Sequence, residues 1–332
     1  MSINGARLED SAFLAGIDDR DRKIWRFLGT VVGGLASGLV AGLVLGIVVF
    51  VVFILSTGVF NGLHSLDPVS LSARMQATLS GESMKSAILI LMLAVSTNGP
   101  MALVFIFVAC LLMRRRFRDY VTAAPKFRWR LLLLGLGLSF LIIGPVLAVL
   151  QLADPTSPRP PMLTLAHTLG MRAVYVLACV GLLIPAAAAE EVVFRGWMLK
   201  QSAVLTRNVW LLMLLNGALF SAVHGEFAPD AFITRTLMGA GFVYMTLRLG
   251  GIEFSIGANA ANNIMIVLFL QPLSLKPPPS AGLGAGTILQ DAFLFAAYVA
   301  MTELIARWAP LRRWAGVDLA RGPASAEAEM FA

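Results

Sequence analysis

The chain has 332 residues; 58% of them are apolar, 14% carry a formal charge, and the net charge at pH 7 is +7. Ordinary soluble domains contain about 25% charged residues, and a soluble chain of this composition would leave too much apolar surface in water. The composition excludes a soluble domain, a disordered chain, a disulfide scaffold and a coiled coil. It predicts an all-α fold, a polytopic membrane bundle of helices in one domain.

Eight apolar segments follow one another along the chain, and each approaches or exceeds the roughly 20 residues that a membrane-spanning helix needs. They cover residues 27–55, 86–113, 131–152, 167–189, 209–225, 229–248, 251–271 and 287–306. We therefore predict about eight transmembrane helices. The expected organisation is a polar N-terminal segment (1–26), a transmembrane bundle (27–306) and a C-terminal tail (307–332).

The basic residues gather on one side of this predicted bundle. Of the 26 lysines and arginines, the six on the other side are Arg74, Lys85, Arg159, Arg172, Arg235 and Lys276. An even number of spans places both termini on the same side of the membrane. Because the cytoplasmic loops of membrane proteins retain lysine and arginine, we expect that side to be the cytoplasm. Membrane topology accounts for the basic charge, and no nucleic-acid partner is expected.

Small residues in the apolar segments indicate packing. In the first segment, Gly34, Gly38 and the two glycines that follow at 42 and 46 recur every fourth residue, which lets another helix approach closely. Cys110 and Cys179 lie inside apolar segments, and we interpret them as small core residues, with no disulfide or metal between them.

The first polar group within a span consists of Glu190, Glu191 and Arg195, which follow an apolar, alanine-rich stretch. Ionisable residues are costly in lipid, which makes each a candidate for function. Glu191 and Arg195 are four residues apart and can pair on one face of a helix. Glu190 is offset by about 100° and faces elsewhere. It is therefore the unpaired carboxylate and a candidate general base.

The second polar residue is His224, at the end of the fifth segment. If the fourth segment continues as a helix to about residue 205, a turn at 206–208 separates two antiparallel helices. Glu190 and His224 then lie at the same depth, each about 25 Å from that turn at 1.5 Å per residue. At one depth, a carboxylate and an imidazole can share a water molecule. A structural histidine is the alternative interpretation.

The third polar group lies in the seventh segment, where Asn259 and Asn263 are four residues apart and share a helix face. Asparagines in an apolar helix are costly unless they are hydrogen-bonded. They either join helices through hydrogen bonds or supply amide donors to a developing oxyanion.

These motifs on successive helices resemble those of the CPBP family, also called Abi, which includes the type II CAAX prenyl endopeptidases and bacteriocin-processing proteins. The resemblance covers roughly residues 167–271. Its Glu-Glu-x-x-x-Arg motif is complete, and its Phe-x-x-x-His motif is present as Phe220 and His224. The third motif differs, because Asn259 stands where the family pattern has its second histidine, whereas Asn263 keeps the asparagine.

The resemblance implies an intramembrane endopeptidase of the bacterial plasma membrane, which hydrolyses a peptide bond in a peptide or membrane-protein substrate and has the lipid bilayer as its other partner. The predicted catalytic residues are Glu190, Glu191, Arg195, His224, Asn259 and Asn263. In the glutamate-based scheme described for the family, Glu190 and His224 activate a water molecule. Glu191 and Arg195 orient the site, and the two asparagines stabilise the oxyanion.

The family is also described as metal-dependent. Zinc prefers imidazole, thiolate or carboxylate ligands, so the amide of Asn259 disfavours zinc and leaves Glu190 and His224 as a weak metal site. We assign no certain cofactor. Two other functions stay open: a catalytically impaired membrane scaffold of the same fold, and a transporter that uses Glu190 as a proton or ion site. The sequence assigns no oligomeric state.

Overall fold

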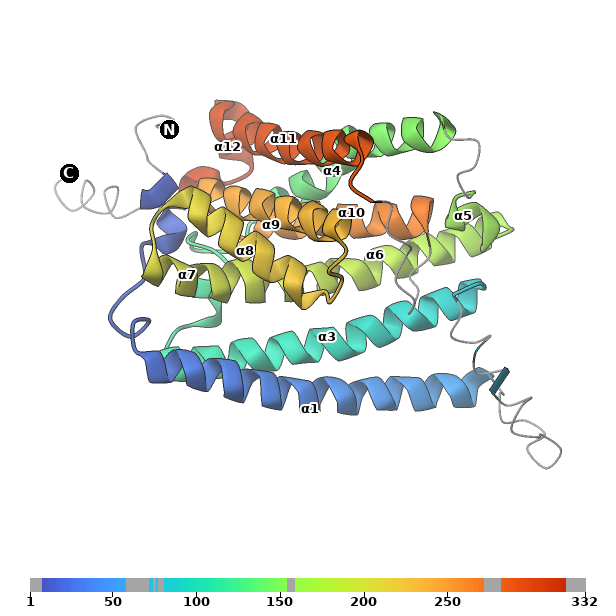
Figure 1. Ribbon diagram of the computed structural model, residues 1–332, viewed down its shortest axis with the longest axis horizontal. Coiled ribbons are helices and arrows are strands. Elements are labelled where there is room, and N and C mark those ends of the chain that lie inside the picture. Colours follow the sequence, from blue (N-terminus) through green and yellow to red (C-terminus); the bar gives the residue numbers. More distant parts are fainter. Residues whose placement is uncertain are drawn as a thin grey trace.

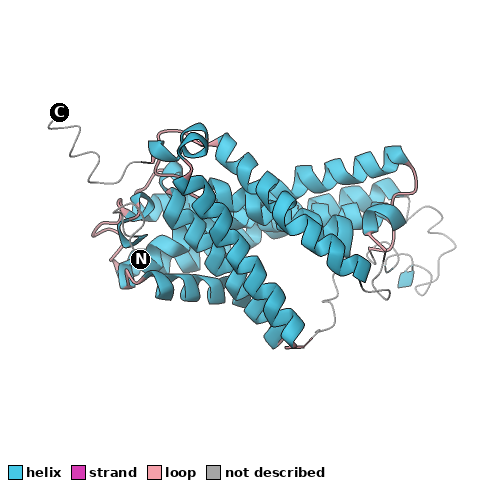
Figure 2. Cartoon of the chain, turned by 90° about the horizontal axis from the view of Figure 1, so that it is seen from above, coloured by secondary structure: helices cyan, strands magenta, loops and turns pink. Residues whose placement is uncertain are grey.

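The computed structural model describes residues 8–57, 72–73, 76, 81–153, 159–271 and 282–320. These residues form helices, turns and one isolated bridge between Thr122 and Gly251, without a strand (Figure 2). The predicted all-α fold class is confirmed. The outer ends of the two predicted tails, 1–7 and 321–332, lie outside the described residues.

A helix occupies each of the eight apolar segments. These helices are α1 (Ile24–Thr57), α3 (Met84–Met113), α4 (Trp129–Ala153), α6 (Leu169–Glu191), α8 (Val209–Val223), α9 (Pro229–Leu249), α10 (Glu253–Met265) and α11 (Ala285–Arg307). Among the described residues, six helical stretches are long and apolar enough to cross a membrane; α8 is apolar but shorter, and α9 is not among the six. The chain is an integral membrane protein, while the count of eight spans stays a prediction.

The fourth span continues well beyond its apolar core, as the sequence predicts. After α6 the backbone passes through a π-helical stretch, η5 (Val192–Met198), into α7 (Leu199–Leu205). Asn208 then caps α8 by accepting a hydrogen bond from the backbone N–H of Leu211 at 3.1 Å. The two helices therefore form the antiparallel hairpin on which the depth comparison of Glu190 and His224 depends.

The helices are arranged in layers that bring α6 and α10 to the centre. In Figure 1, α1 and α3 lie side by side along one edge, and α4 and α11 lie towards the opposite edge. Between them, α10 packs against both α4 and α6, and the α8–α9 hairpin packs against α11 through α9. The candidate residues therefore lie on helices that the rest of the bundle encloses.

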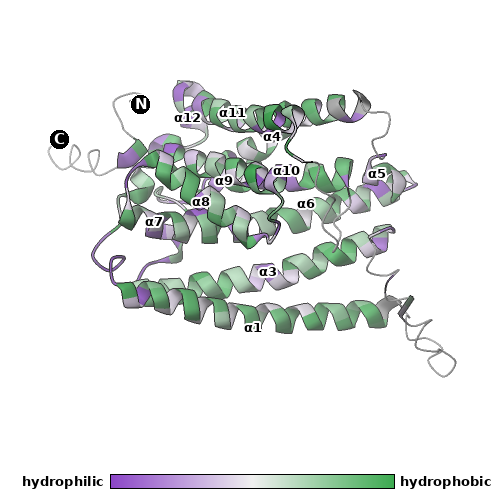
Figure 3. Cartoon of the chain, viewed as in Figure 1, coloured by the Kyte–Doolittle hydropathy of each residue, from purple (hydrophilic) through white to green (hydrophobic). Residues whose placement is uncertain are grey.

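The glycine repeat of α1 makes a close helix contact, as predicted. A Cβ atom at Gly38 would lie 2.7 Å from the carbonyl oxygen of Met101 in α3, and one at Gly42 would lie 2.5 Å from that of Thr97. Elsewhere α1 is apolar along nearly its whole length (Figure 3) and exposes large side chains such as Val32 and Val40. In a membrane these side chains face lipid.

The contact between α4 and α10 is closer still and includes a buried ion pair. A Cβ at Gly257 would lie 2.1 Å from the carbonyl oxygen of Leu132, so the two backbones touch. At the start of α10, Glu253 accepts hydrogen bonds from the Arg128 guanidinium at 2.9 and 2.6 Å, and both side chains are buried. This contact fixes the height of α10, and so the height of its asparagines, relative to α4.

Both ends of the described chain meet at one end of the bundle. A Cβ at Gly250, which follows α9, would lie 2.7 Å from the Cβ of Ala320 and 3.8 Å from that of Ala12. We call this the terminal end. The arrangement is the one that an even number of crossings requires.

Candidate active site

Glu190 and Glu191 stand where the α-helical backbone of α6 changes to the π-helical stretch η5. π-Helical turns inside α-helices are rare and occur frequently at functional sites. Glu191 is completely buried, whereas Glu190 is half-buried. Of the two adjacent glutamates, only Glu190 therefore keeps part of its surface exposed.

Glu191 and Arg195 form the ion pair that their spacing predicts. Arg195 Nη1 donates to Glu191 Oε1 at 2.9 Å, and both side chains are 0% exposed. The guanidinium carbon of Arg195 also lies 4.3 Å from the ring centre of Phe220 and 4.9 Å from that of Phe242. A buried charge needs such compensation, because an unpaired ion in the bundle would cost several kcal/mol.

Asn259 joins the two carboxylates. Its Nδ2 atom donates to Glu190 Oε2 at 3.0 Å and to Glu191 Oε1 at 3.1 Å. Its Oδ1 atom accepts from Asn263 Nδ2 at 3.2 Å. Carboxylates accept hydrogen bonds and do not donate them, so this network fixes which end of the Asn259 amide faces α6.

This network modifies two expectations from the sequence. Glu190 does not point away from its neighbour, because the Asn259 amide draws both carboxylates together. Both hydrogens of Asn259 Nδ2 are engaged by glutamates, whereas Asn263 Nδ2 uses only one of its two hydrogens in the hydrogen bonds that the structure describes. Asn263 is also half-buried, while Asn259 is 1% exposed. An oxyanion would therefore reach Asn263 more readily than Asn259.

His224 lies at the C-terminal cap of α8 and is exposed. Its Nδ1 atom is 2.8 Å from the carbonyl oxygen of Phe220. A carbonyl oxygen only accepts, so Nδ1 carries the proton of the neutral ring and Nε2 keeps its lone pair. The Phe220 ring lies 4.6 Å from the His224 ring and 4.3 Å from the Arg195 guanidinium, which places it between the two.

The structure thus brings five of the six predicted residues into one hydrogen-bonded group, which contains Glu190, Glu191, Arg195, Asn259 and Asn263. His224 touches this group through the Phe220 ring, and no hydrogen bond in the described part of the chain joins it to Glu190. A shared water molecule between Glu190 and His224 stays a prediction.

Sequence reasoning missed three neighbours of this group. Phe242 covers the Arg195 guanidinium, Gly239 accepts a hydrogen bond from Arg195 Nη2 at 3.4 Å, and the Tyr298 ring packs against α9. The small residues Gly239 and Gly241 indicate close packing along α9, since a Cβ at Gly241 would lie 2.9 Å from the Tyr298 ring. Nothing in the local sequence indicates that this packing surrounds Arg195.

Two polar atoms inside the group have no hydrogen-bond partner among the described residues. They are Glu191 Oε2 and Arg195 Nε, and both are buried. Buried polar atoms are normally satisfied by protein groups or by ordered water. The group therefore offers one acceptor and one donor beyond the contacts that hold it together.

The side chains of the group do not fit a zinc ion. Glu191 is committed to Arg195, and Asn259 presents its N–H groups, which cannot bind a metal, towards the carboxylates. Only Glu190 and His224 are left as ligands, whereas catalytic zinc sites use three protein ligands. Across the ranges that the structure describes, no three histidine, cysteine, aspartate or glutamate side chains gather closely enough to hold a metal.

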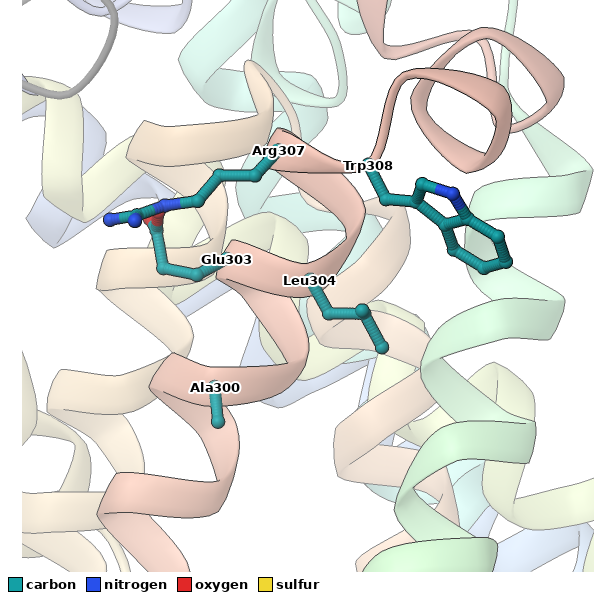
Figure 4. Close-up of a pocket in the computed structure, with 5 residues that line it drawn as sticks. All are labelled: Ala300, Glu303, Leu304, Arg307 and Trp308. Carbon is teal, nitrogen blue, oxygen red and sulfur yellow. The ribbon is translucent and has the colours of Figure 1, made fainter.

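A shallow groove on the surface of α11 lies outside this group. It measures about 410 Å³ and is lined by Ala300, Glu303, Leu304, Arg307 and Trp308 (Figure 4). Glu303 is paired with Arg248 at 2.8 Å and with Arg307 at 2.7 Å. Its carboxylate is therefore neutralised, and the groove holds none of the predicted catalytic residues.

Comparison with known proteins agrees with the motif analysis. Residues 172–265 match the family model described as type II CAAX prenyl endopeptidase Rce1-like. A protein of Bacillus subtilis (strain 168) that carries the name "Uncharacterized protein YyaK" is 32% identical over 166 residues, which are 48% of this chain and 54% of that protein. The aligned part of the chain thus spans about half the length of this relative. No solved structure matches the chain.

The matched segment contains all six predicted catalytic residues, and the resemblance inferred from the motifs is confirmed for it. The match supports a membrane enzyme of the CAAX protease type. It does not assign a role to any single side chain.

Proposed function

We propose that the protein is an intramembrane endopeptidase in which Glu190 activates the water molecule that hydrolyses a peptide bond. The observation that carries this proposal is the contrast between the two adjacent glutamates. Glu191 is fully buried and paired with Arg195, whereas Glu190 is half-buried, has no ion pair with any described residue and is oriented by the Asn259 amide. An accessible carboxylate held in one orientation is what general-base catalysis requires.

In the proposed reaction, Glu190 takes a proton from water while the water oxygen attacks the peptide carbonyl carbon. The tetrahedral intermediate carries a negative oxygen, and we assign its stabilisation to the second N–H of Asn263 Nδ2, since the first N–H donates to Asn259 Oδ1. The C–N bond then breaks as the nitrogen receives the proton, which gives a carboxylate and an amine. His224, whose Nε2 lone pair is free in the neutral ring, is proposed to assist the movement of this proton.

Glu191, Arg195 and Asn259 act on Glu190 without touching substrate. Arg195 holds Glu191, and Asn259 spans Glu191 and Glu190, so the three form a continuous support for the reacting carboxylate. We propose that the protein works in this way in the bacterial plasma membrane, on a peptide or a membrane protein.

The test uses the purified protein in lipid nanodiscs, incubated with a library of membrane-anchored peptides and analysed by mass spectrometry. Wild type should cleave at least one peptide, and Glu190→Gln and His224→Ala should each abolish that cleavage while the protein remains folded. Glu303→Gln is the matched control, because it removes the same charge from the remote groove on α11 and should leave cleavage intact. If Glu190→Gln and His224→Ala both cleave like wild type, the proposal is wrong.

A second candidate function is a catalytically impaired scaffold of the same fold. The observation that favours it is Asn259, which engages both carboxylates in a position where the family pattern has histidine. Wild type that cleaves no peptide in the library, yet is isolated with a bound partner protein, would support this candidate. A transporter would instead move ions across liposomes in a manner that depends on Glu190, and a protease should show no such flux.

A further inference from the structure

The N-terminal part of the described chain is folded against the bundle. Residues 8–17, which we call the strap, include two short 3-10 helices, η1 (Leu8–Asp10) and η2 (Ala12–Leu14). Phe13 and Leu14 are each 1% exposed and belong to a core cluster that also contains residues of α7 and α9. Ser11 Oγ donates to the carbonyl oxygen of Leu247 in α9 at 2.6 Å.

A buried lysine ties the strap to the helix that carries the glutamates. Lys200 in α7 is 3% exposed; its Nζ donates to the carbonyl oxygen of Phe13 and lies 4.0 Å from the centre of the Phe13 ring. Lysine is almost never buried without compensation, because the desolvated ammonium is costly. The strap supplies both contacts, so α7 and the strap depend on each other.

A second anchor lies in the loop after α3. The side chain of Arg115 is 5% exposed, pairs with Asp21 and donates to the carbonyl oxygen of Gly16. Nearby, hydrogen bonds from Arg20 lower the pKa of the Asp18 carboxyl to about 2, so this side chain stays charged at neutral pH. The strap is thus held at α7, at α9 and at the loop between α3 and α4.

The strap and the α8–α9 turn lie at opposite ends of α9, because Ser11 contacts Leu247 in the last turn of α9 and the turn directly precedes Pro229. Lys200 lies ten residues after Glu190 on the same continuous helix, about 15 Å further towards the terminal end. On the other side, His224 is exposed in the turn between α8 and α9, and Phe227 in that turn is 69% exposed. In the same region Glu226 pairs with Arg235 at 2.7 Å, and both side chains are about a quarter exposed.

We propose that the strap is a fixed plug over the terminal end of α7 and α9, and that substrate and water reach Glu190 from the side of the α8–α9 turn. The inference deepens the proposed function and rests on it, because it names the route by which a peptide reaches the reacting carboxylate.

The route is tested by thiol labelling of purified full-length protein in which Cys110 and Cys179 are replaced by alanine. Two single cysteines are compared on the helix that carries Glu190. Ala186→Cys lies one turn before Glu190 on the same face and is half-buried; Ala203→Cys lies one turn after Lys200, beneath the strap, and is 3% exposed. The probe is a quaternary-ammonium methanethiosulfonate.

The Ala186→Cys variant should react at least tenfold faster than the Ala203→Cys variant when the strap is intact. Replacing Phe13 and Leu14 together by alanine should raise the rate of the Ala203→Cys variant at least tenfold and leave that of the Ala186→Cys variant unchanged. Leu319→Ala is the matched control, since it removes an exposed leucine at the terminal end and should change neither rate. If the double strap variant does not fold, Phe13→Ala alone is used, with the same expected order of rates.

Equal labelling rates for the two variants when the strap is intact, or no change in the rate of the Ala203→Cys variant when the strap is weakened, would overturn the proposal. Labelling requires no cleavage. The labelling rates can therefore contradict the proposed route while the endopeptidase proposal stands, and a failure to detect cleavage leaves the test of the route unaffected. In nanodiscs, labelling of the Ala186→Cys variant should also block peptide cleavage, which links the labelled position to the path of the substrate.

Discussion

The buried pair Glu191–Arg195 gives a prediction with a magnitude that can be worked from the structure. Replacing Arg195 by methionine leaves Glu191 as an uncompensated charge at a position with no exposure. Breaking a buried ion pair from one side costs about 3–5 kcal/mol. For a chain of this size, the expected drop in melting temperature is on the order of 10 °C.

Replacing both residues should cost much less. When Glu191→Met accompanies Arg195→Met, no charge is left without its partner, and such apolar replacements of a buried pair are often neutral or stabilising. We therefore expect the double variant to recover at least half of the stability that Arg195→Met loses. It should not recover cleavage, because Asn259 Nδ2 loses its hydrogen bond to Glu191 and is then held only by Glu190 itself.

The assay is thermal unfolding in detergent followed by tryptophan fluorescence, with the free energy measured by reversible unfolding in mixed micelles. Wild type, the two single variants and the double variant together form a double-mutant cycle. If the double variant is as unstable as Arg195→Met, the loss arises from packing of the arginine against Phe220 and Phe242, and the electrostatic reasoning is refuted.

Three further predictions concern the helices around the site. Asn259→His adds a third ligand to Glu190 and His224, so bound zinc measured by elemental mass spectrometry should rise; no gain in zinc would contradict the ligand argument. Gly257→Val forces α10 away from α4, where a Cβ already meets a carbonyl at 2.1 Å, and should abolish cleavage and lower the unfolding free energy by more than about 1–3 kcal/mol. Arg128→Met leaves Glu253 buried without its partner and should destabilise the protein by about 3–5 kcal/mol, measured by the same unfolding assay.

Much of the site is local in sequence, and this part could be predicted. The spacing of Glu191 and Arg195 sets their pairing, and the continuation of α6 into α7 follows from an unbroken run of helix-compatible residues up to residue 205. The eight apolar segments predicted the helices because lipid imposes one length and one composition on each span.

The remaining features depend on contacts between distant segments. That Asn259 bridges both glutamates follows from how closely α10 approaches α6, and this approach is set by the contact of Gly257 with α4. The sequence did not predict the strap for a similar reason. Phe13 and Leu14 stand in a mixed, charged stretch with no periodic pattern, and they are buried by residues of α7 and α9 much further along the chain, where Lys200, 187 residues after Phe13, also contacts it.

Asn259 differs from the histidine of the family pattern, but this difference is consistent with an active site because the amide orients the two glutamates. Its nitrogen carries two hydrogens, one for each glutamate. A histidine ring nitrogen carries only one, so it could orient only one of the two carboxylates. The asparagine therefore favours a chemistry based on carboxylates and water over one based on a metal.

The most direct test of the central claim is the effect of Glu190→Gln on cleavage of a substrate that wild type has been shown to hydrolyse. Rates are measured under single turnover in nanodiscs, and substrate affinity is measured separately. The account predicts that the cleavage rate falls by about 10²–10⁴-fold, the contribution expected of a general base, with unchanged affinity and melting temperature. A Glu190→Gln variant that keeps more than a tenth of the wild-type rate would contradict the account.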